Sequence, residues 1–329
     1  MKKRIVSYNF ILIALLIILI GIIIAGKIPQ QENQYFHVGI AVYNMEDTYM
    51  QDYMEQLQNV LEEYDYSGKK LLYEILDAEG DLNRQQKQLQ YMCSQNFDAL
   101  LINLVKPTLA ASILNKAADL NIPVILFNRE TEEKNLMISD NIWYVGTNAK
   151  TEGIIQGEML TKLWSRQNTE VDRNKNGKLD YVLVEGEETH FDTIRRTNGF
   201  LESSSDINLN QLGNISADWR RTLAFDEFSK LDQKIIDNVE VVVCHNDDMA
   251  LGIYDYYKEN QMQMPIIVGI NNNSELHEKV KLGEIYGTVD NNIEEQAMYM
   301  GTLLDGIFQG QVEGFEKVWY SKPYMVIQQ

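Results

Sequence analysis

The sequence predicts an α/β protein made of two doubly wound lobes, each built around a parallel β-sheet. At 329 residues the chain is long enough for two domains of ordinary size. Short apolar runs rich in β-branched residues alternate with longer amphipathic stretches, which is the pattern of consecutive βαβ units. This alternation runs to about residue 129 and then restarts, which indicates a second lobe.

The predicted elements follow from hydrophobic periodicity along the chain. The segments expected as strands are residues 35–43, 70–76, 99–103, 123–127, 143–146, 181–184, 240–244, 266–269, 286–289 and 325–327. The segments expected as helices are residues 50–64, 82–96, 108–120, 151–167, 195–203, 226–237, 249–257 and 293–309. Parallel strands joined by helices require right-handed crossovers, so both lobes should carry helices on both faces of the sheet.

The composition excludes some classes of partner. A formal net charge of −19 argues against binding to nucleic acid or to an anionic membrane surface, because both need basic patches. An apolar fraction of 45% is typical of a globular protein with real cores. Cys93 and Cys244 lie far apart, each beside an apolar segment, and we expect buried free thiols rather than a disulfide framework.

The N-terminal residues have the pattern of an export signal. Lys2, Lys3 and Arg4 precede residues 10–26, which are uncharged and almost wholly apolar. No clear cleavage site follows the apolar segment, and no Cys follows it for lipid attachment. We therefore expect an exported chain with an N-terminal hydrophobic helix, which is either a cleaved signal peptide or a retained membrane anchor.

Polar side chains follow the ends of the predicted strands. These residues are Asp47, Tyr49, Asn103, Asn128, Arg129, His190, Asp192, Arg196, Asn246 and Asn271. In doubly wound sheets the carboxyl ends of the strands share one edge, and two such edges facing each other form a cleft. Carboxylate, amide and guanidinium groups suit the paired hydroxyls of a neutral polyhydroxyl ligand, and aromatic faces suit its C–H groups.

Residues 172–180 resemble the start of a calcium-binding loop. Oxygen-bearing side chains alternate along the sequence DRNKNGKLD, and Gly177 occupies the sixth position, where a sharp turn is needed. The twelfth position is Leu183, whereas an EF-hand has a bidentate Glu there. Either the match is accidental, or a carboxylate from elsewhere in the chain completes the site.

From about Tyr35 to its end, the chain resembles the periplasmic galactose/glucose-binding proteins of bacterial ABC importers. The segments that carry the resemblance are 38–50 (VGIAVYNMEDTYM), 101–107 (LINLVKP), 123–130 (PVILFNRE), 143–159 (WYVGTNAKTEGIIQGEM), 172–180 (DRNKNGKLD), 186–197 (GEETHFDTIRRT), 240–252 (EVVVCHNDDMALG) and 287–292 (GTVDNN). The calcium-like loop beside the GEETHFD segment narrows a broader sugar-binding superfamily to this group.

The resemblance implies the type I periplasmic binding protein fold, with two lobes joined by a hinge of several strands. Residues 35–129 and 293–321 would form the N-terminal lobe. Residues 130–292 and 322–329 would form the C-terminal lobe, which would carry the calcium loop at 172–180. Residues 1–34 would be the signal peptide or anchor with a short linker.

The resemblance also implies roles for individual residues. Tyr49 and Trp219 would cover the two faces of a pyranose ring. The residues that would hydrogen-bond the sugar are Asp47, Asn103, His190, Asp192, Arg196, Asn246, Asn271 and Asn291. The residues that would bind a structural Ca²⁺ are Asp172, Asn174, Asn176, Lys178 through its carbonyl, Asp180 and the distant Glu240.

This sequence departs from the family pattern at four of these positions. Asn271 stands where the family has Asp, and Tyr49 stands where it usually has Phe. In the loop, Asn176 replaces an Asp and Asp180 replaces an amide residue. The change at position 271 removes a charge-assisted acceptor, so the affinity or the preferred hexose is expected to differ.

The expected function is that of an exported substrate-binding protein that delivers a hexose to the permease of an ABC importer. The alternative is a membrane-tethered hexose sensor that signals to a histidine kinase or chemoreceptor. A sugar-responsive repressor is excluded because a hydrophobic segment, not a helix-turn-helix, precedes residue 35. His190 near Asp192 could suggest a general base, but no motif places a Ser or Cys nucleophile, so we do not expect an enzyme.

Overall fold

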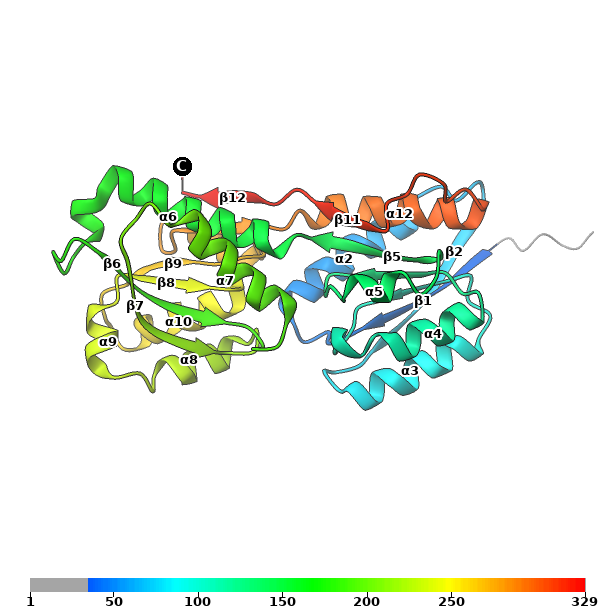
Figure 1. Ribbon diagram of the computed structural model, residues 1–329, viewed down its shortest axis with the longest axis horizontal. Helices are drawn as coiled ribbons and strands as arrows, with labels where there is room; N and C mark the ends of the chain where they lie inside the picture. The colour runs from blue at the N-terminus through cyan, green and yellow to red at the C-terminus, as the bar shows by residue number, and fades with distance from the viewer. Residues whose placement is uncertain (1–34, 329) are drawn as a thin grey trace, which may run out of the picture.

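The computed structural model describes residues 35–328, which form two α/β lobes lying side by side (Figure 1). The predicted fold class is confirmed for this part of the chain. The predictions of a hydrophobic helix and of an anchor or signal at residues 1–34 lie outside the described residues. Among the residues that the structure describes, no helix combines the length and the apolar character needed to cross a membrane.

The N-terminal lobe contains a six-stranded parallel sheet with the order β11-β5-β4-β3-β1-β2. Its strands are β1 (Tyr35–Val42), β2 (Lys70–Asp77), β3 (Ala99–Ile102), β4 (Val124–Phe127), β5 (Ile142–Thr147) and β11 (Val318–Ser321). Helices α2 (Thr48–Glu63) and α12 (Ile293–Gln309) cover one face, and α3 (Leu82–Ser94), α4 (Ala111–Asp119) and α5 (Glu133–Leu136) cover the other. The central strands are buried on both faces, as their continuous apolar runs predict.

The C-terminal lobe repeats this design with the order β12-β10-β9-β8-β6-β7. Its strands are β6 (Leu179–Glu185), β7 (Leu209–Ser216), β8 (Val241–Cys244), β9 (Ile266–Val268), β10 (Gly287–Asp290) and β12 (Tyr324–Ile327), of which only β12 is antiparallel to its neighbour. Helices α8 (Arg221–Phe228), α9 (Gln233–Asn238), α10 (Asp247–Glu259) and α11 (Ser274–Lys281) cover one face. Helices α6 (Ala149–Val171) and α7 (Phe191–Ser203) cover the other.

Helices α6 and α7 approach each other unusually closely because glycines line their contact. A Cβ atom on Gly153 would lie 2.1 Å from the carbonyl oxygen of Arg196, and one on Gly199 would lie 2.1 Å from that of Lys150. Both distances are far below van der Waals contact, so a side chain at either position would force the helices apart. The close approach brings the first turn of α6 against the middle of α7.

The chain crosses between the lobes three times, between β5 and α6, between β10 and α12, and between β11 and β12 (Figure 1). Side-chain hydroxyls hold the crossings together. The Thr147 and Ser321 hydroxyls lie 3.1 and 2.7 Å from the Asn291 carbonyl oxygen, and 3.0 Å from each other. The predicted multi-strand hinge is therefore present, with one polar residue contributed by each crossing.

The predicted lobe boundary after residue 129 is wrong. Strand β5, expected to open the second lobe, lies in the first sheet between β4 and β11. The connection from β4 to β5 contains only the short helix α5, and β5 pairs with β4 in the same sheet. The chain therefore first crosses to the C-terminal lobe after Thr147. The boundary expected after residue 321 falls between β11 and β12, which lie in different lobes.

Some elements also differ from the sequence prediction. The helix expected at residues 226–237 is two helices, α8 and α9, with Asp232 capping the second. Strands β7 and β11 and helix α11 were not predicted. Strand β7 is a half-buried edge strand containing Asn, Gln and Gly, so it lacks the apolar run that marks the central strands. Cys93 and Cys244 are buried and unpaired with each other, as predicted.

Candidate ligand-binding site

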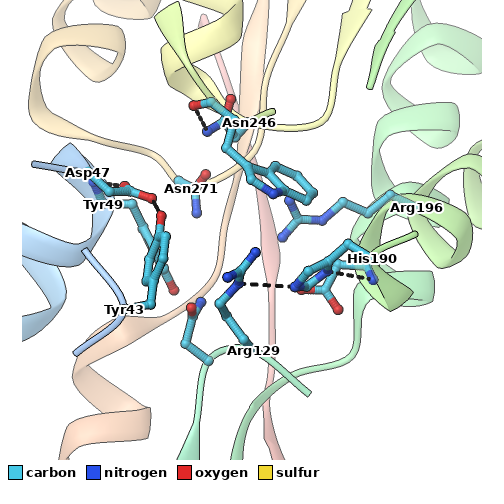
Figure 2. Close-up of a pocket in the computed structure, with 11 residues that line it drawn as sticks. Tyr43, Asp47, Tyr49, Arg129, His190, Arg196, Asn246 and Asn271 are labelled. Atoms are coloured by element: carbon cyan, nitrogen blue, oxygen red, sulfur yellow. Dashed lines mark hydrogen bonds and ion pairs between the residues drawn. The ribbon is translucent and has the colours of Figure 1, made fainter. Parts of the chain in front are cut away.

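A cavity lies between the lobes at the carboxyl ends of both sheets (Figure 2). The N-terminal lobe contributes Tyr43, Asp47, Tyr49, Asn128 and Arg129. The C-terminal lobe contributes His190, Asp192, Arg196, Trp219, Asn246 and Asn271. Eight of the ten residues predicted to bind ligand therefore line one cavity. The roles assigned to them by resemblance stay predictions.

Three of these side chains also start helices that point toward the cavity. Asp47 caps α2 by accepting hydrogen bonds from the Tyr49 and Met50 amides. His190 accepts from the Asp192 amide at the start of α7. Asn246 accepts from the Met249 amide at the start of α10. A polar residue that ends a strand and caps the next helix is held rigidly at the edge of the sheet. The positive ends of three helix dipoles therefore converge on the cavity.

The Asp47 carboxylate has a divided role. Its Oδ1 caps α2 at 2.9 Å from the Tyr49 amide, and its Oδ2 accepts a hydrogen bond from the Tyr43 hydroxyl. Burial, together with the nearby Asp248 carboxylate, raises the pKa of Asp47 to about 7, although Arg129 opposes the shift. The carboxylate is therefore held in an environment with too few positive partners for its charge.

Trp219 forms a wall of the cavity from a strained turn. Both Asp218 and Trp219 have positive φ, at 46° and 66°, which is unusual for residues with side chains. The indole lies over Gly186, where a Cβ atom would come within 2.2 Å of the ring. Its Nε1 donates to Glu187 at 3.2 Å, and the Arg196 guanidinium lies 5.5 Å from its ring centre. Gly186 is thus required for the indole to reach this position.

Arg196 is buried and held on two sides. Its Nε donates to Glu152 at 2.6 Å, and its Nη1 donates to the carbonyl oxygen of His245. Burial alone would lower the pKa of Arg196, but the carboxylates of Glu152 and Asp192 outweigh it and raise the pKa above its ordinary value. The guanidinium is therefore a fixed positive charge in the cleft.

Arg129 reaches from the N-terminal lobe to the other side of the cavity (Figure 2). Its Nη1 donates to the Val105 carbonyl at 2.6 Å, its Nη2 forms an ion pair with Glu187, and its Nε lies 3.1 Å from the Nε2 of His190. Burial and the Arg129 charge lower the pKa of His190 to about 3, so its imidazole is neutral. Arg129 therefore links the lobes without presenting an unpaired charge to a ligand.

Asn103 and Asn291 were predicted as ligand contacts but do not line the cavity. Asn103 is fully buried behind it, where it accepts from the Tyr43 amide and donates to the Asn128 side chain. Asn291 is 3% exposed and donates to Glu152 at 2.6 Å. Asn103 thus orders two residues that do line the cavity.

Sequence reasoning left three lining residues out of the predicted ligand set: Tyr43, Asn128 and Arg129. The rule that ligands bind at strand ends had placed Asn128 and Arg129 at this edge of the sheet. It missed Tyr43, which was expected inside the first strand but follows β1 directly. The resemblance supplied no role for them.

The loop at residues 172–180 does meet Glu240, as predicted. The two carboxylate oxygens of Glu240 accept from the amides of Asn174 and Asp180, each at 2.9 Å. Asp172 accepts from the amides of Asn176 and Gly177, at 3.0 and 2.9 Å, and Gly177 has a φ of 71°. Within residues 35–328, however, no group of three or more His, Cys, Asp or Glu side chains is arranged to hold a metal ion.

The donor set of the loop nevertheless has the chemistry that a hard cation prefers. Asp172, Asp180 and Glu240 supply carboxylate oxygens around one loop, and the amides of Asn174 and Asn176 both lie 2.7 Å from the Asp180 carboxylate. Rotating either amide by 180° about its last side-chain bond would present its oxygen instead of its nitrogen. The residues therefore fit a calcium ion by type, with Asp180 at the centre of the set.

The raised pKa of Asp47 makes a testable contribution to stability. Between the ordinary pKa of 3.8 and the folded value of about 7, the folded chain holds a proton on Asp47 that the unfolded chain has lost. The contribution of Asp47 to the free energy of unfolding should therefore fall as the pH rises from about 4 to about 7. Denaturant unfolding of the ligand-free wild type and of Asp47→Asn across this range measures it.

Asn retains the helix cap, so the variant isolates the titration of the carboxyl group. We expect the wild type to lose more stability than Asp47→Asn between pH 4 and pH 7. Parallel stability curves for the two proteins would show that Asp47 titrates normally in the folded chain.

Comparison with known proteins confirms the resemblance stated from the motifs. Residues 38–311 match the periplasmic binding protein domain family. The chain is 31% identical over 292 residues to the D-galactose/methyl-galactoside binding periplasmic protein of Haemophilus influenzae, covering 88% of this chain and 86% of that one. It is 24% identical over 280 residues to the ribose import binding protein of Bacillus subtilis, covering 84% and 83% of the two chains.

Solved structures support the same fold. The crystal structure of a galactofuranose binding protein superposes with a TM-score of 0.76 at 22% identity, covering 89% of this chain and 94% of that one. The match to residues 38–311 spans both lobes and the first two crossings between them. The chain therefore belongs to the periplasmic binding protein domain family, whose members bind solutes outside the cytoplasm rather than transform them.

Proposed function

We propose that this chain binds a hexose of the galactose or glucose type between its lobes and delivers it to an ABC importer. The observation that carries the proposal is the cavity in which Tyr49 and Trp219 come from opposite lobes and lie among carboxylate, amide and guanidinium groups. The name of the Haemophilus influenzae relative supports the same ligand class.

Each type of side chain has a defined task in this proposal. The faces of Tyr49 and Trp219 cover the apolar C–H faces of the pyranose ring. The carboxylates of Asp47 and Asp192 accept hydrogen bonds from neighbouring hydroxyls. In Arg196, Nε donates to Glu152 and Nη1 donates to the His245 carbonyl oxygen. Nη2 has no hydrogen-bond partner among residues 35–328, and it is the nitrogen that donates to the ligand.

The charges around the cavity favour a neutral sugar over a sugar acid. Arg129 pairs with Glu187, and Arg196 pairs with Glu152, so each guanidinium has its own carboxylate. An anionic ligand would add a negative charge beside Asp47, whose pKa is already raised by burial and by Asp248. Burying an unpaired charge is strongly unfavourable, whereas a neutral hexose adds only hydrogen-bonding groups.

Asn271 bears on the choice between hexoses. It lines the cavity and has a φ of 124°, so its backbone is fixed in an unusual conformation at the end of β9. An amide offers a neutral acceptor and a donor where the family has a carboxylate with acceptors only. Hexoses that differ in one hydroxyl orientation are therefore expected to be ranked differently from the family pattern.

Delivery to an importer and signalling to a sensor remain alternatives that share the same ligand. Both need the chain to be exported, and the basic residues before the apolar segment 10–26 support export. The missing Cys after that segment favours a tether of the peptide type over a lipid anchor. Permease and ATPase genes beside the gene for this chain would support transport, and a kinase gene alone would support sensing.

We also propose a structural Ca²⁺ at residues 172–180. Asp172, Asn174, Asn176, the Lys178 carbonyl and Asp180 would supply oxygens from the loop, and Glu240 would supply the ligand that the loop lacks at its twelfth position. Two contacts of Glu240 with the loop support this assignment. The ion would tie the loop to the start of β8, the strand that leads to Asn246.

A titration of the purified full-length chain tests the hexose proposal. Calorimetry with D-galactose and with D-glucose should give saturable binding of at least one sugar. Trp219→Ala should weaken that binding at least tenfold, because it removes one of the two aromatic faces. Trp164→Ala is the matched control: this Trp packs against the core of the C-terminal lobe and does not line the cavity.

Unchanged affinity is expected for the control variant. Absence of binding heat with both hexoses, in buffer that contains calcium, would refute the hexose assignment. Equal weakening by both Trp substitutions would show that Trp219 acts through the stability of the lobe alone.

Chelation tests the calcium site. An ion that binds only the folded chain raises the melting temperature, so EDTA should lower it in the wild type. Glu240→Gln should reduce this effect of EDTA, because it removes a carboxylate from the proposed donor set. A chelator-insensitive melting curve, with no calcium found by elemental analysis, would contradict the proposal.

A further inference from the structure

We propose that Glu152, which does not line the cleft, is a positioning residue for the ligand site. It holds Arg196 in place and fixes the orientation of the Asn291 amide. The inference rests on the proposed function, in which Arg196 donates to the ligand. A ligand contact for Asn291 is implied by the resemblance. Glu152 lies on α6, within the segment 143–159 that carries the resemblance, but neither the strand-end rule nor the resemblance assigned it a role.

Glu152 is a buried carboxylate whose two oxygens have separate partners. It is 1% exposed, and its Oε2 accepts from the Nε of Arg196 at 2.6 Å. Its Oε1 accepts from the Nδ2 of Asn291, also at 2.6 Å. Burial raises the pKa of Glu152, and the nearby Arg196 charge opposes that shift. A buried carboxylate with two short charge-assisted contacts fixes both partners.

The backbone holds Glu152 at this position. It lies in the first turn of α6, one residue before Gly153, which meets the backbone of Arg196 itself. The glycines of α6 and α7 allow the two helices to touch. The Glu152 side chain is therefore long enough to reach the Arg196 guanidinium. The Nη2 of Arg196 then remains for the ligand.

The carboxylate also decides which way the Asn291 amide points. An ionised carboxylate can only accept hydrogen bonds, so Asn291 must turn its Nδ2 toward Glu152 and its Oδ1 away. That Oδ1 is buried and has no hydrogen-bond partner among residues 35–328. Buried acceptors without a donor are rare. Asn291 is not among the residues that line the cavity, and it is the resemblance that assigns a ligand hydroxyl as the donor for this oxygen.

Glu152 also supplies the counter-charge for Arg196. Arg196 is buried in the cleft wall, where its Nε donates to Glu152 at 2.6 Å. Glu152 is not among the residues that line the cavity. A carboxylate there balances Arg196 without competing with the ligand for the free nitrogen.

The same contact reaches the hinge. The carbonyl oxygen of Asn291 is the acceptor within reach of Thr147 and Ser321, so the residue that Glu152 orients belongs to a crossing between the lobes. Gln296 donates to this carbonyl at 2.8 Å as well. Glu152 thus connects the ligand-facing Arg196 to the point where the lobes are joined.

Glu152→Gln tests the inference. A Gln side chain has one acceptor oxygen and one donor nitrogen, so it can keep the bond from Arg196 only by turning its nitrogen toward Asn291. The Asn291 amide would then have to turn its oxygen toward position 152, and the orientation proposed for ligand binding would be lost. With the better-binding hexose, the Kd of Glu152→Gln should rise at least tenfold over the wild type. The expected size follows from the loss of one buried charge-assisted hydrogen bond.

A second substitution separates positioning from mere stability. In the double variant Glu152→Gln/Asn291→Asp, the amide nitrogen at position 152 donates to the carboxylate at position 291. The negative charge is thereby transferred from position 152 to position 291. One oxygen of that carboxylate accepts from the amide and the other replaces the unpartnered acceptor. The double variant should therefore recover most of the hexose affinity, which a purely structural role for Glu152 would not predict.

Glu202→Gln is the matched control. Glu202 pairs with Lys150 at 2.7 Å and joins the same two helices, but at their exposed surface. Its hexose affinity should equal that of the wild type, and melting curves should confirm that all variants are folded. Glu152→Asp provides a second readout if Glu152→Gln does not fold, because it keeps the charge but cannot reach both partners and should bind with intermediate affinity.

The outcomes are distinct. A wild-type Kd for Glu152→Gln, a loss no larger than that of Glu202→Gln, or a wild-type Kd for Glu152→Asp would overturn the inference. Failure of the double variant to bind better than Glu152→Gln would also overturn it, since the charge would then not act through Asn291. If the wild type binds neither hexose, the proposed function fails and this inference falls with it.

Discussion

The three crossings between the lobes are the constraint on which the rest of the structure depends. Thr147, Asn291 and Ser321 come from different parts of the chain, yet two hydroxyls meet one carbonyl oxygen at the point where the lobes join. Buried backbone carbonyls need donors, so these contacts both satisfy the hinge and fix where each crossing begins. The carboxyl ends of the two sheets consequently face each other, and the cavity forms between them.

The chemistry of the cavity follows from how its side chains are anchored. Asp47, His190 and Asn246 each cap a helix and thereby lose part of their hydrogen-bonding capacity to the backbone. The hydrogen-bonding groups that are left for the ligand belong to side chains that are already fixed. Binding therefore carries a smaller entropy cost, because these side chains need not be ordered again. The two guanidinium groups are each paired with a carboxylate, so the cleft is strongly polar but offers no uncompensated positive charge.

Much of this arrangement could be predicted from the sequence, and the misses have physical reasons. Polar residues after apolar strands located most of the cavity, because parallel strands share one edge. The lobe boundary was misplaced because a strand such as β5 has the same local pattern in either sheet. Glu152 was missed because it lies on a helix, and its contact with Arg196 depends on glycines that allow two helices to touch. That contact is tertiary and leaves no local pattern in the chain.

The most direct test of the account is a crystal structure of the full-length chain with the hexose that binds best in solution. We expect the sugar ring to lie between Tyr49 and Trp219, with Arg196 bonded at once to Glu152 and to a sugar hydroxyl. A sugar bound outside the cavity would contradict the proposed site. An Arg196 side chain that leaves Glu152 when the sugar binds would contradict the view that the carboxylate holds the guanidinium in place for its ligand.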